Sequence, residues 1–408
     1  MTDVLRRGRT SLAFSFLVQG VAFALLVTRI PGIQNRYGVS DGMLPVFLAA
    51  VPILAGIGSV SERLVRRVPP SRVLRWSQPV VLLALLAVGA GRQMAVLALA
   101  LAAFGLAVGA LDASMNMLGV SLQRAYGRSI MLSFHAAYSL GGIVGASLAW
   151  VGAHYGLALW VSYLPVVLVL LPAALVGSRW YVDGEAQAPE EKGAAAGAGG
   201  GLKWLLPLCL VMTVAYIGDS TVSNWSAKYL QDVLGSSEQM ATVPYNVYMV
   251  TTLLGRTVGD IGVRRLGAVA VVRAGALVAA AGFAVVAAAP GAWVGMLGFT
   301  LLGLGLCVLV PQTFAAAGRR AYETGRPGAS DAAVARLNVF NYVGFLVGSP
   351  LVGALGDAWS YRGAMLVPMV LVLVTLVHAR SFAPGADRYG GGHERPRTAD
   401  VGRSSNGL

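Results

Sequence analysis

The amino-acid sequence predicts an all-α polytopic membrane protein with twelve transmembrane helices in two pseudo-symmetric six-helix bundles. Three observations carry this prediction. Of 408 residues, 56% are hydrophobic and only 12% are charged, and the mean hydropathy is +0.68, far from the composition of soluble proteins. The chain contains twelve apolar runs, each near the ~20 residues that a helix needs to cross a bilayer with its backbone hydrogen bonds satisfied. One long polar stretch separates the first six runs from the last six.

The predicted helices follow the apolar runs in chain order. In the first set they cover residues 11–30, 43–60, 73–90, 94–118, 130–152 and 156–176. In the second set they cover residues 204–223, 240–257, 268–289, 292–315, 334–355 and 363–380. The stretch DGEAQAPEEKGAAAGAGGG between the sets is a flexible linker by composition. We therefore divide the chain into an N-terminal bundle (1–177), a cytoplasmic linker (178–203), a C-terminal bundle (204–380) and a disordered cytoplasmic tail (381–408).

The positive charge is distributed as the positive-inside rule of membrane proteins requires. The formal net charge is +13, and the arginines cluster at the ends of alternate apolar runs. If the helices alternate in direction, the opposite side keeps little basic charge beyond Arg36, Arg92, Lys228 and Arg362. We therefore expect both termini on the cytoplasmic side of the cell (inner) membrane, and we expect no nucleic-acid partner.

Several kinds of chemistry lack the residues that they need. Cys209 and Cys307 both lie within apolar runs, which disfavours a disulfide framework, and the four histidines are scattered, which disfavours a metal site. The sequence has no Walker pattern G-x-x-x-x-G-K-[ST], so direct coupling to ATP is not expected. A polytopic membrane enzyme would need clustered catalytic residues near one surface, and the sequence suggests none. We expect neither catalysis nor a cofactor.

The two halves of the chain contain similar fifth helices. FHAAYSLGGIVGAS aligns at one constant offset with LNVFNYVGFLVGSP, so that Gly141 matches Gly344 and Gly145 matches Gly348. This is the pattern of a duplicated six-helix unit. Glycines four residues apart let two helices approach closely, although the abundance of glycine, 52 residues, is an alternative explanation.

Two loops at matching places in the halves combine a glycine, an acid and paired arginines: GSVSERLVRR and GRTVGDIGVRRLG. They resemble the signature loop of the major facilitator superfamily, approximately G-x-x-x-D-R-x-G-R-R, although the first has Val65 in place of the second glycine. In that family such residues form weak interhelical charge contacts that close the cytoplasmic gate and break in each cycle. The resemblance implies a cytoplasmic gate formed by Glu62, Arg63, Arg66, Arg67, Arg124, Asp260, Arg264 and Arg265. A plain positive-inside loop would explain the arginines but not the acids.

Longer stretches resemble one branch of this superfamily, the YbjJ-like transporters of bacterial inner membranes. These stretches are TRIPGIQNRYGVSD, ALDASMNMLGV, SFHAAYSLGG, NWSAKYLQDVLG and GLGLCVLVPQTFAAAGR, and the resemblance covers nearly the whole chain. It implies the fold of the superfamily, a solute site at the midplane between the bundles, and alternating access by rocking. One departure is Asn224, which stands where an acid is expected before Trp225.

Asp112 lies in a nearly unbroken apolar run, where a charged side chain costs ~2.5 to 3.5 kcal/mol on insertion scales and usually faces a partner or a cavity. Helical spacing places Asn116 on the same face. Counting from the short loop that follows places Asp112 and His135 in the same half of the bilayer, where they could meet. Carboxyl and imidazole groups can exchange protons, so we interpret the two as a proton-coupling pair. Alternatively, Asp112 only hydrogen-bonds neighbouring helices or holds Arg124.

Asp219 is the second candidate for proton coupling, because it lies in a polar stripe on the predicted seventh helix. In the superfamily the first, fourth, seventh and tenth helices line the central cavity, and here the fifth and eleventh carry further polar stripes. The candidate substrate contacts are Gln19, Asn116, Tyr138, Gln312, Asn338 and Asn341. For each single residue, hydrogen bonding between helices is an equally good explanation.

These observations predict a secondary active transporter of the major facilitator superfamily that moves a small organic solute by alternating access, coupled to protons. Few fixed charges in the expected site favour a neutral or weakly charged solute, and export is favoured over uptake. We expect a monomer whose partners are the solute, protons and the lipid bilayer. Two alternatives stay open: a sugar or nutrient uptake symporter, and a membrane sensor that keeps this scaffold without transporting.

Overall fold

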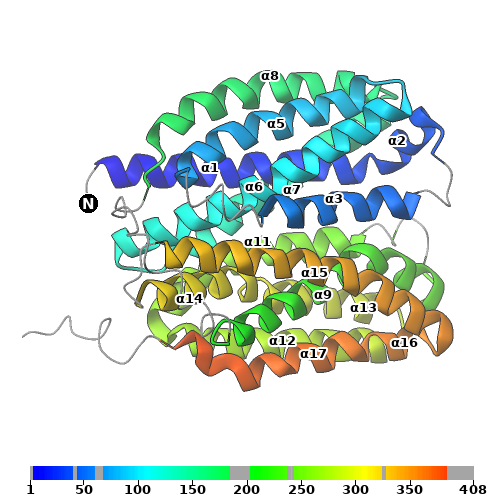
Figure 1. Ribbon diagram of the computed structural model, residues 1–408. Coiled ribbons are helices and arrows are strands. Elements are labelled where there is room, and N and C mark those ends of the chain that lie inside the picture. The colour runs from blue at the N-terminus through cyan, green and yellow to red at the C-terminus, as the bar shows by residue number, and fades with distance from the viewer. Residues whose placement is uncertain are drawn as a thin grey trace, which may run out of the picture.

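The computed structural model describes residues 3–39, 44–59, 68–183, 203–236, 240, 243–323 and 328–383. These residues are almost entirely helical, and none of them belongs to a β-strand. The helices lie side by side in two layers, with the first half of the chain (blue to green) above the second half (green to red) in Figure 1. The two halves of the sequence are therefore also two halves of the molecule.

The helices follow one another with short connections. The first half contains α1 (Asp3–Thr28), α2 (Ile30–Tyr37), α3 (Leu44–Ser59), α5 (Pro70–Ala90), α6 (Met94–Tyr126), α7 (Met131–His154) and α8 (Leu159–Gly177), followed by the short η1 (Ser178–Trp180). The second half contains α9 (Leu206–Lys228), η3 (Tyr229–Val233), α11 (Val243–Leu266), α12 (Ala268–Ala288), α13 (Ala292–Leu306), α14 (Leu309–Glu323), α15 (Ala329–Ala358), α16 (Tyr361–Ala364), α17 (Leu366–His378) and η4 (Ala379–Phe382).

Each of the twelve predicted apolar runs coincides with one of these helices or, for residues 292–315, with the pair α13 and α14. Ten helical stretches are long and apolar enough to cross a membrane, counting α13 with α14 and α16 with α17. The two remaining runs correspond to α3, which has a shorter apolar part in the described residues, and α11, which carries several charges. The all-helical, twelve-span prediction is confirmed. Residues 184–202 of the predicted linker and 384–408 of the predicted tail lie outside the described residues.

The apolar side chains are distributed as in a protein solvated by lipid. Leu99, Trp293 and Val377 are exposed to 72%, 76% and 76% of their surface, although a soluble fold would cover such residues. Polar side chains lie inside instead, with Asn116 and Asn338 both fully buried between helices. The chain is therefore a multi-pass membrane protein whose polar residues face one another across the bundle.

The matching glycines pack corresponding helix pairs in the two halves. A Cβ atom added at Gly141 or Gly145 of α7 would lie closer than 3.0 Å to the backbone of α1. One added at Gly344 or Gly348 of α15 would lie closer than 3.0 Å to the backbone of α9. Since α1 and α9 are the first helices of their halves, each fifth helix packs against its own first helix through the same two positions.

The predicted tenth span is interrupted, because residues 307 and 308 form a turn between α13 and α14. Proline has no N–H group, so Pro311 cannot donate to the carbonyl of Cys307 four residues earlier. That carbonyl accepts a hydrogen bond from Arg256 Nε of α11 at 3.4 Å instead. Irregular backbone at membrane depth needs such a partner within the protein. The sequence predicted one continuous helix here, and the structure corrects it to two.

Candidate functional site

Asp112 of α6 joins the two halves of the molecule through its carboxylate. From the first half, Gln19 Nε2 and Asn116 Nδ2 each lie 3.4 Å from Oδ1. From α15 of the second half, Asn341 Nδ2 donates to Oδ2 at 3.1 Å and Tyr342 Oη donates at 3.2 Å. All four partners present donors, which suits an ionised carboxylate because it only accepts. Along α6, Asp112 lies ~20 Å from the end at Tyr126, deep in the bilayer.

The hydrogen bonds around Asp112 continue along α15 to α3. Asn341 Nδ2 also donates to Asn338 Oδ1 at 3.1 Å, and Asn338 Nδ2 donates to Ser59 Oγ at 3.0 Å. Residues 338, 341 and 342 share one face of α15 because they are three and four positions apart. We call the set of Gln19, Ser59, Asp112, Asn116, Asn338, Asn341 and Tyr342 the interdomain network. It brings together five of the residues predicted for the substrate cavity or for proton coupling.

Asp219 lies on α9 within the second half, and its principal partner is a tyrosine. Tyr248 Oη of α11 donates to Asp219 Oδ1 at 2.6 Å. Tyr138 of α7 lies near enough to both Asp112 and Asp219 to interact with the charge of each. Asp112, Tyr138 and Asp219 are all only half-buried, although they lie between the layers. The two predicted acids therefore face the same region between the halves.

Arg256 of α11 adds a positive charge to this region and contacts the first half. Its Nη1 donates to Ser139 Oγ at 2.6 Å and to the carbonyl of His135 at 3.3 Å, both on α7. Its charge also interacts with Asp219. Sequence reasoning missed Arg256 because it falls at the end of an apolar run and beside a basic loop. An arginine four residues before Asp260, one helical turn deeper in the bilayer, was the available indication.

His135 lies apart from Asp112. Its ring packs against Phe16 and Phe314, with centroid separations of 5.3 and 6.3 Å. Its Nε2 atom is buried without a hydrogen-bond partner among the described residues. The predicted direct pair of Asp112 and His135 is therefore not formed in this conformation, because the imidazole is held in an aromatic environment.

Three predicted cavity residues keep buried polar atoms that no group in the described part of the chain satisfies. They are Gln19 Oε1, Asn116 Oδ1 and Gln312 Nε2. Gln312 lies on α14, just after the interruption of the tenth span, and only 3% of its surface is exposed. Buried polar groups in native proteins almost always have a partner, so these two acceptors and one donor indicate a place for a polar ligand or water.

The halves are also joined near one end of the bundle, where Asp260 of α11 caps the first turn of α7. Asp260 accepts hydrogen bonds from Ser129 Oγ at 2.7 Å, from Ser133 N at 2.9 Å and from Leu132 N at 3.3 Å. The residue before α7, Ile130, has no side chain able to cap it. Gln123 Oε1 of α6 accepts from the N–H groups of Ile130 and Met131, and Asp260 of the other half accepts from the next two. We call this contact the latch. The favourable interaction of a carboxylate with a helix N-terminus stabilises it further.

Asp260 makes an interhelical contact in the latch, and its hydrogen-bond donors come from α7 and the loop before it rather than from the predicted arginines, although the charge of Arg264 also interacts with it. Arg264 Nη1 donates to the carbonyl of Ser129 at 3.4 Å, whereas Arg265 is exposed. Arg124 of α6 lies with its guanidinium 4.1 Å from the ring centroid of Tyr322 on α14, so it bridges the halves rather than holding Asp112. The first-half candidates Glu62, Arg63, Arg66 and Arg67 lie outside the described residues.

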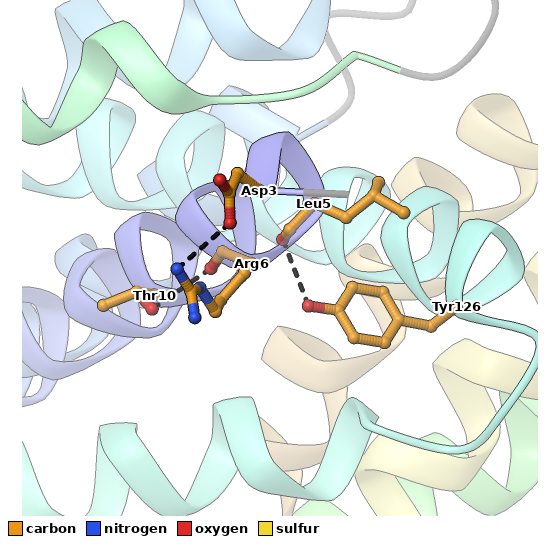
Figure 2. Close-up of polar contacts among 5 residues, drawn as sticks. All are labelled: Asp3, Leu5, Arg6, Thr10 and Tyr126. Atoms are coloured by element: carbon orange, nitrogen blue, oxygen red, sulfur yellow. Dashed lines mark hydrogen bonds and ion pairs between the residues drawn. The ribbon is translucent and has the colours of Figure 1, made fainter. Parts of the chain in front are cut away.

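The latch and the contact of Arg124 lie at the end of the bundle that carries the start of α1. Tyr126 Oη, at the end of α6, donates to the carbonyl of Leu5 at 3.1 Å, as Figure 2 shows. The loop from α6 to α7 that holds the latch begins at the next residue. At this end the two halves therefore approach each other closely in the present conformation.

Comparison with known proteins agrees with this architecture. A model of the Major Facilitator Superfamily matches residues 208–399. An uncharacterized MFS-type transporter of Yersinia pestis is 28% identical over 387 residues, which cover 91% of this chain and 95% of the relative. The membrane protein MosC of Rhizobium meliloti is 27% identical over 396 residues, which cover 95% of this chain and 92% of the relative. An uncharacterized transporter of Sinorhizobium fredii is 25% identical over 356 residues, which cover 86% of this chain and 92% of the relative.

Solved structures share the fold at low sequence identity. The transporter FucP in its outward conformation superposes with a TM-score of 0.74 at 18% identity, covering 92% of this chain and 98% of FucP. The human organic anion transporter MFSD10 superposes with a TM-score of 0.75 at 15% identity, covering 93% of this chain and 100% of that chain. With the helical two-layer fold, these matches show that residues 208–399 fit the sequence model of the major facilitator superfamily and that the whole chain has the fold of its transporters.

Proposed function

We propose that the protein is a proton-coupled secondary transporter that moves a small polar organic solute across the cytoplasmic membrane by alternating access. In this proposal both termini are cytoplasmic, and the predicted direction is export. The observation that carries the proposal is the carboxylate of Asp112, which is deep in the bilayer and bonded to donors from both halves. An acid deep in a membrane helix is energetically costly, and its presence is usually functional.

Protonation of Asp112 would change the contact between the halves. The ionised carboxylate accepts from Gln19, Asn116, Asn341 and Tyr342, and no partner presents an acceptor to it. A protonated carboxyl must donate one hydrogen bond, so at least one of these partners must turn away or reverse its role. Where the partner that changes is Asn341 or Tyr342, proton uptake weakens the bonds to α15 and favours separation of the halves, which is the coupling that a proton-driven transporter requires.

Asp219 and Arg256 supply the charged part of the proposed solute site. Asp219 is held by Tyr248 within the second half, and Arg256 bridges to α7 of the first half. The unsatisfied atoms of Gln19, Asn116 and Gln312 offer two acceptors and one donor. A neutral or zwitterionic solute with several hydroxyl or amine groups matches this set better than a phosphate ester, which would need more cationic side chains.

Support from the comparisons is limited to the general activity. One solved structure of the same fold is that of the E. coli fucose:proton symporter FucP. That protein couples a small polar solute to protons, and we extend this mode of coupling to the present chain as part of the proposal. The resemblance to the YbjJ-like branch stays a prediction.

The first experiment identifies the solute. Small molecules inside and outside cells of the source organism are compared with and without the gene. A compound retained in cells of the deletion strain indicates export, and one left unconsumed in the medium indicates uptake. If no compound differs between the strains and no flux occurs in reconstituted vesicles, a sensor without transport replaces the proposal.

The second experiment tests the role of Asp112 with that solute. We expect Asp112→Asn to insert and bind solute but to lose solute flux driven by a proton gradient in proteoliposomes. The matched control is Asp357→Asn, which changes an exposed acid that accepts a hydrogen bond from Tyr361 Oη at 2.7 Å within the second half. Uphill transport by Asp112→Asn at the rate of the control would reject Asp112 as the coupling group.

A further inference from the structure

A cleft opens on the outer surface of the first half, between the start of α1 and the end of α8. Its volume is about 920 Å³. α1 contributes Arg6, Arg7 and Thr10 to its lining, and α8 contributes an apolar wall. The wall consists of Val169, Pro172, Ala173 and Val176, continued by Trp180. The cleft therefore has one basic side and one apolar side.

The two sides of the cleft match the two parts of a membrane lipid. Val169 and Val176 of α8 are exposed to 66% and 47% of their surface, which places this wall against the hydrocarbon. Trp180, exposed to 42%, follows the end of α8, where tryptophan side chains are typical of the boundary between hydrocarbon and headgroups. Arg6 and Arg7 lie in the first turns of α1 at the same end of the bundle.

The basic side of the cleft carries a net positive charge that can attract an anion. Arg7 is exposed and makes no hydrogen bond or ion pair with any described residue. Arg6 pairs with Asp3 at 3.0 Å, but both side chains are more than two thirds exposed, so this pair is weak and exchangeable (Figure 2). Two guanidinium groups thus face one carboxylate, and the cleft keeps a positive excess.

We propose that this cleft binds one anionic glycerophospholipid, whose phosphate is held by Arg6 and Arg7 and whose acyl chain lies along α8. A free phosphate would leave the apolar wall unused, and a zwitterionic lipid would bring a second cation to a cationic site. Basic pockets next to membrane helices at the cytoplasmic surface have this chemistry in general. The lipid would hold the start of α1, which also contacts the α6–α7 corner through Leu5 and Tyr126.

The test uses the full-length protein in lipid nanodiscs and compares phosphatidylglycerol with phosphatidylcholine of the same acyl chains. Retained lipid is counted by native mass spectrometry after delipidation. A basic residue at an anionic surface contributes on the order of a five-fold increase in affinity, so two arginines predict a preference of about 30-fold for phosphatidylglycerol. Equal retention of the two lipids by the unaltered protein would overturn the proposal without any variant.

A double variant locates the site. We expect Arg6→Gln with Arg7→Gln to reduce the preference to near unity, while Arg273→Gln with Arg380→Gln keeps it. The control pair removes the same charge from two other exposed arginines of the described chain. Retention of the full preference by the Arg6 and Arg7 variant would place the lipid elsewhere. Soluble glycerol phosphate should fail to displace the lipid, and displacement at equal concentration would show that the anion alone is recognised.

Discussion

Removal of the Asp260 carboxylate tests the latch quantitatively. Asp260→Ala deletes three hydrogen bonds, to Ser129 Oγ, Leu132 N and Ser133 N, with lengths of 2.7, 3.3 and 2.9 Å. Water replaces these bonds when the halves separate, so each contributes about 1 kcal/mol net, or about 3 kcal/mol together. That difference shifts the equilibrium toward separation roughly 100-fold. If the separated form is on the order of 1% populated in the unaltered protein, the variant should be about half separated.

The assay is a distance measurement between spin labels by pulsed electron paramagnetic resonance. Labels at Ala125 and Leu266 sit at exposed ends of α6 and α11, on opposite sides of the latch. The natural Cys209 and Cys307 are buried and are replaced by alanine first. We expect Asp260→Ala to produce a second, longer distance with about half of the total amplitude.

Two further variants bound the result. Asp260→Asn keeps one acceptor oxygen but loses the charge, so it should give an intermediate fraction of the long distance. Asp357→Ala removes an acid whose bond, to Tyr361, joins residues within the second half, and it should leave the distances unchanged. If Asp260→Ala gives the same distance distribution as Asp357→Ala, the latch does not hold the halves together and the reasoning is refuted.

Two more predictions concern packing and the central charge. Gly141→Ala should lower the free energy of unfolding by about 1–3 kcal/mol, because the added Cβ collides with the backbone of α1. Gly142→Ala should not lower it, because a Cβ added there meets no atom within 4 Å. Thermal melting of the purified variants compares them, and equal melting temperatures would contradict the close packing. Arg256→Lys should keep the charge but not the fork of contacts to Ser139 and Cys307. We expect its solute flux to fall at least ten-fold, and flux equal to that of the unaltered protein would show that only the charge matters.

Much of the fold could be predicted because a long apolar segment that crosses the hydrocarbon must satisfy its backbone hydrogen bonds internally, as a helix does. Each run of about 20 residues had to be a helix, and the match of Gly141 with Gly344 correctly indicated repeated packing. The interruption before α14 was not predicted, because hydropathy stays high through residues 292–315. Pro311 marks the place, but a proline in a membrane helix often leaves a kink rather than a break.

The candidate site was predictable only as a set of residue types. A carboxylate or amide inside an apolar run points inward, which selected Asp112, Asn338 and Asn341. Which of them meet depends on how far α15 is shifted along α6, and that register is set by packing across the two halves. The contact of Tyr342 with Asp112 follows from this register, whereas the separation of His135 from Asp112 follows from the packing of the imidazole on α7 against Phe16 and Phe314. No local sequence pattern determines the register of α15 along α6.

The latch has a consequence for how freely this protein can diverge. Two of the three donors to Asp260 are main-chain N–H groups, at positions 132 and 133, which every residue except proline provides. Leu132 can therefore be exchanged for many other residues without loss of its part in closure, while the acid on α11 must stay. Two proteins of this fold can thus close in the same way although the first turns of their fifth helices have nothing in common.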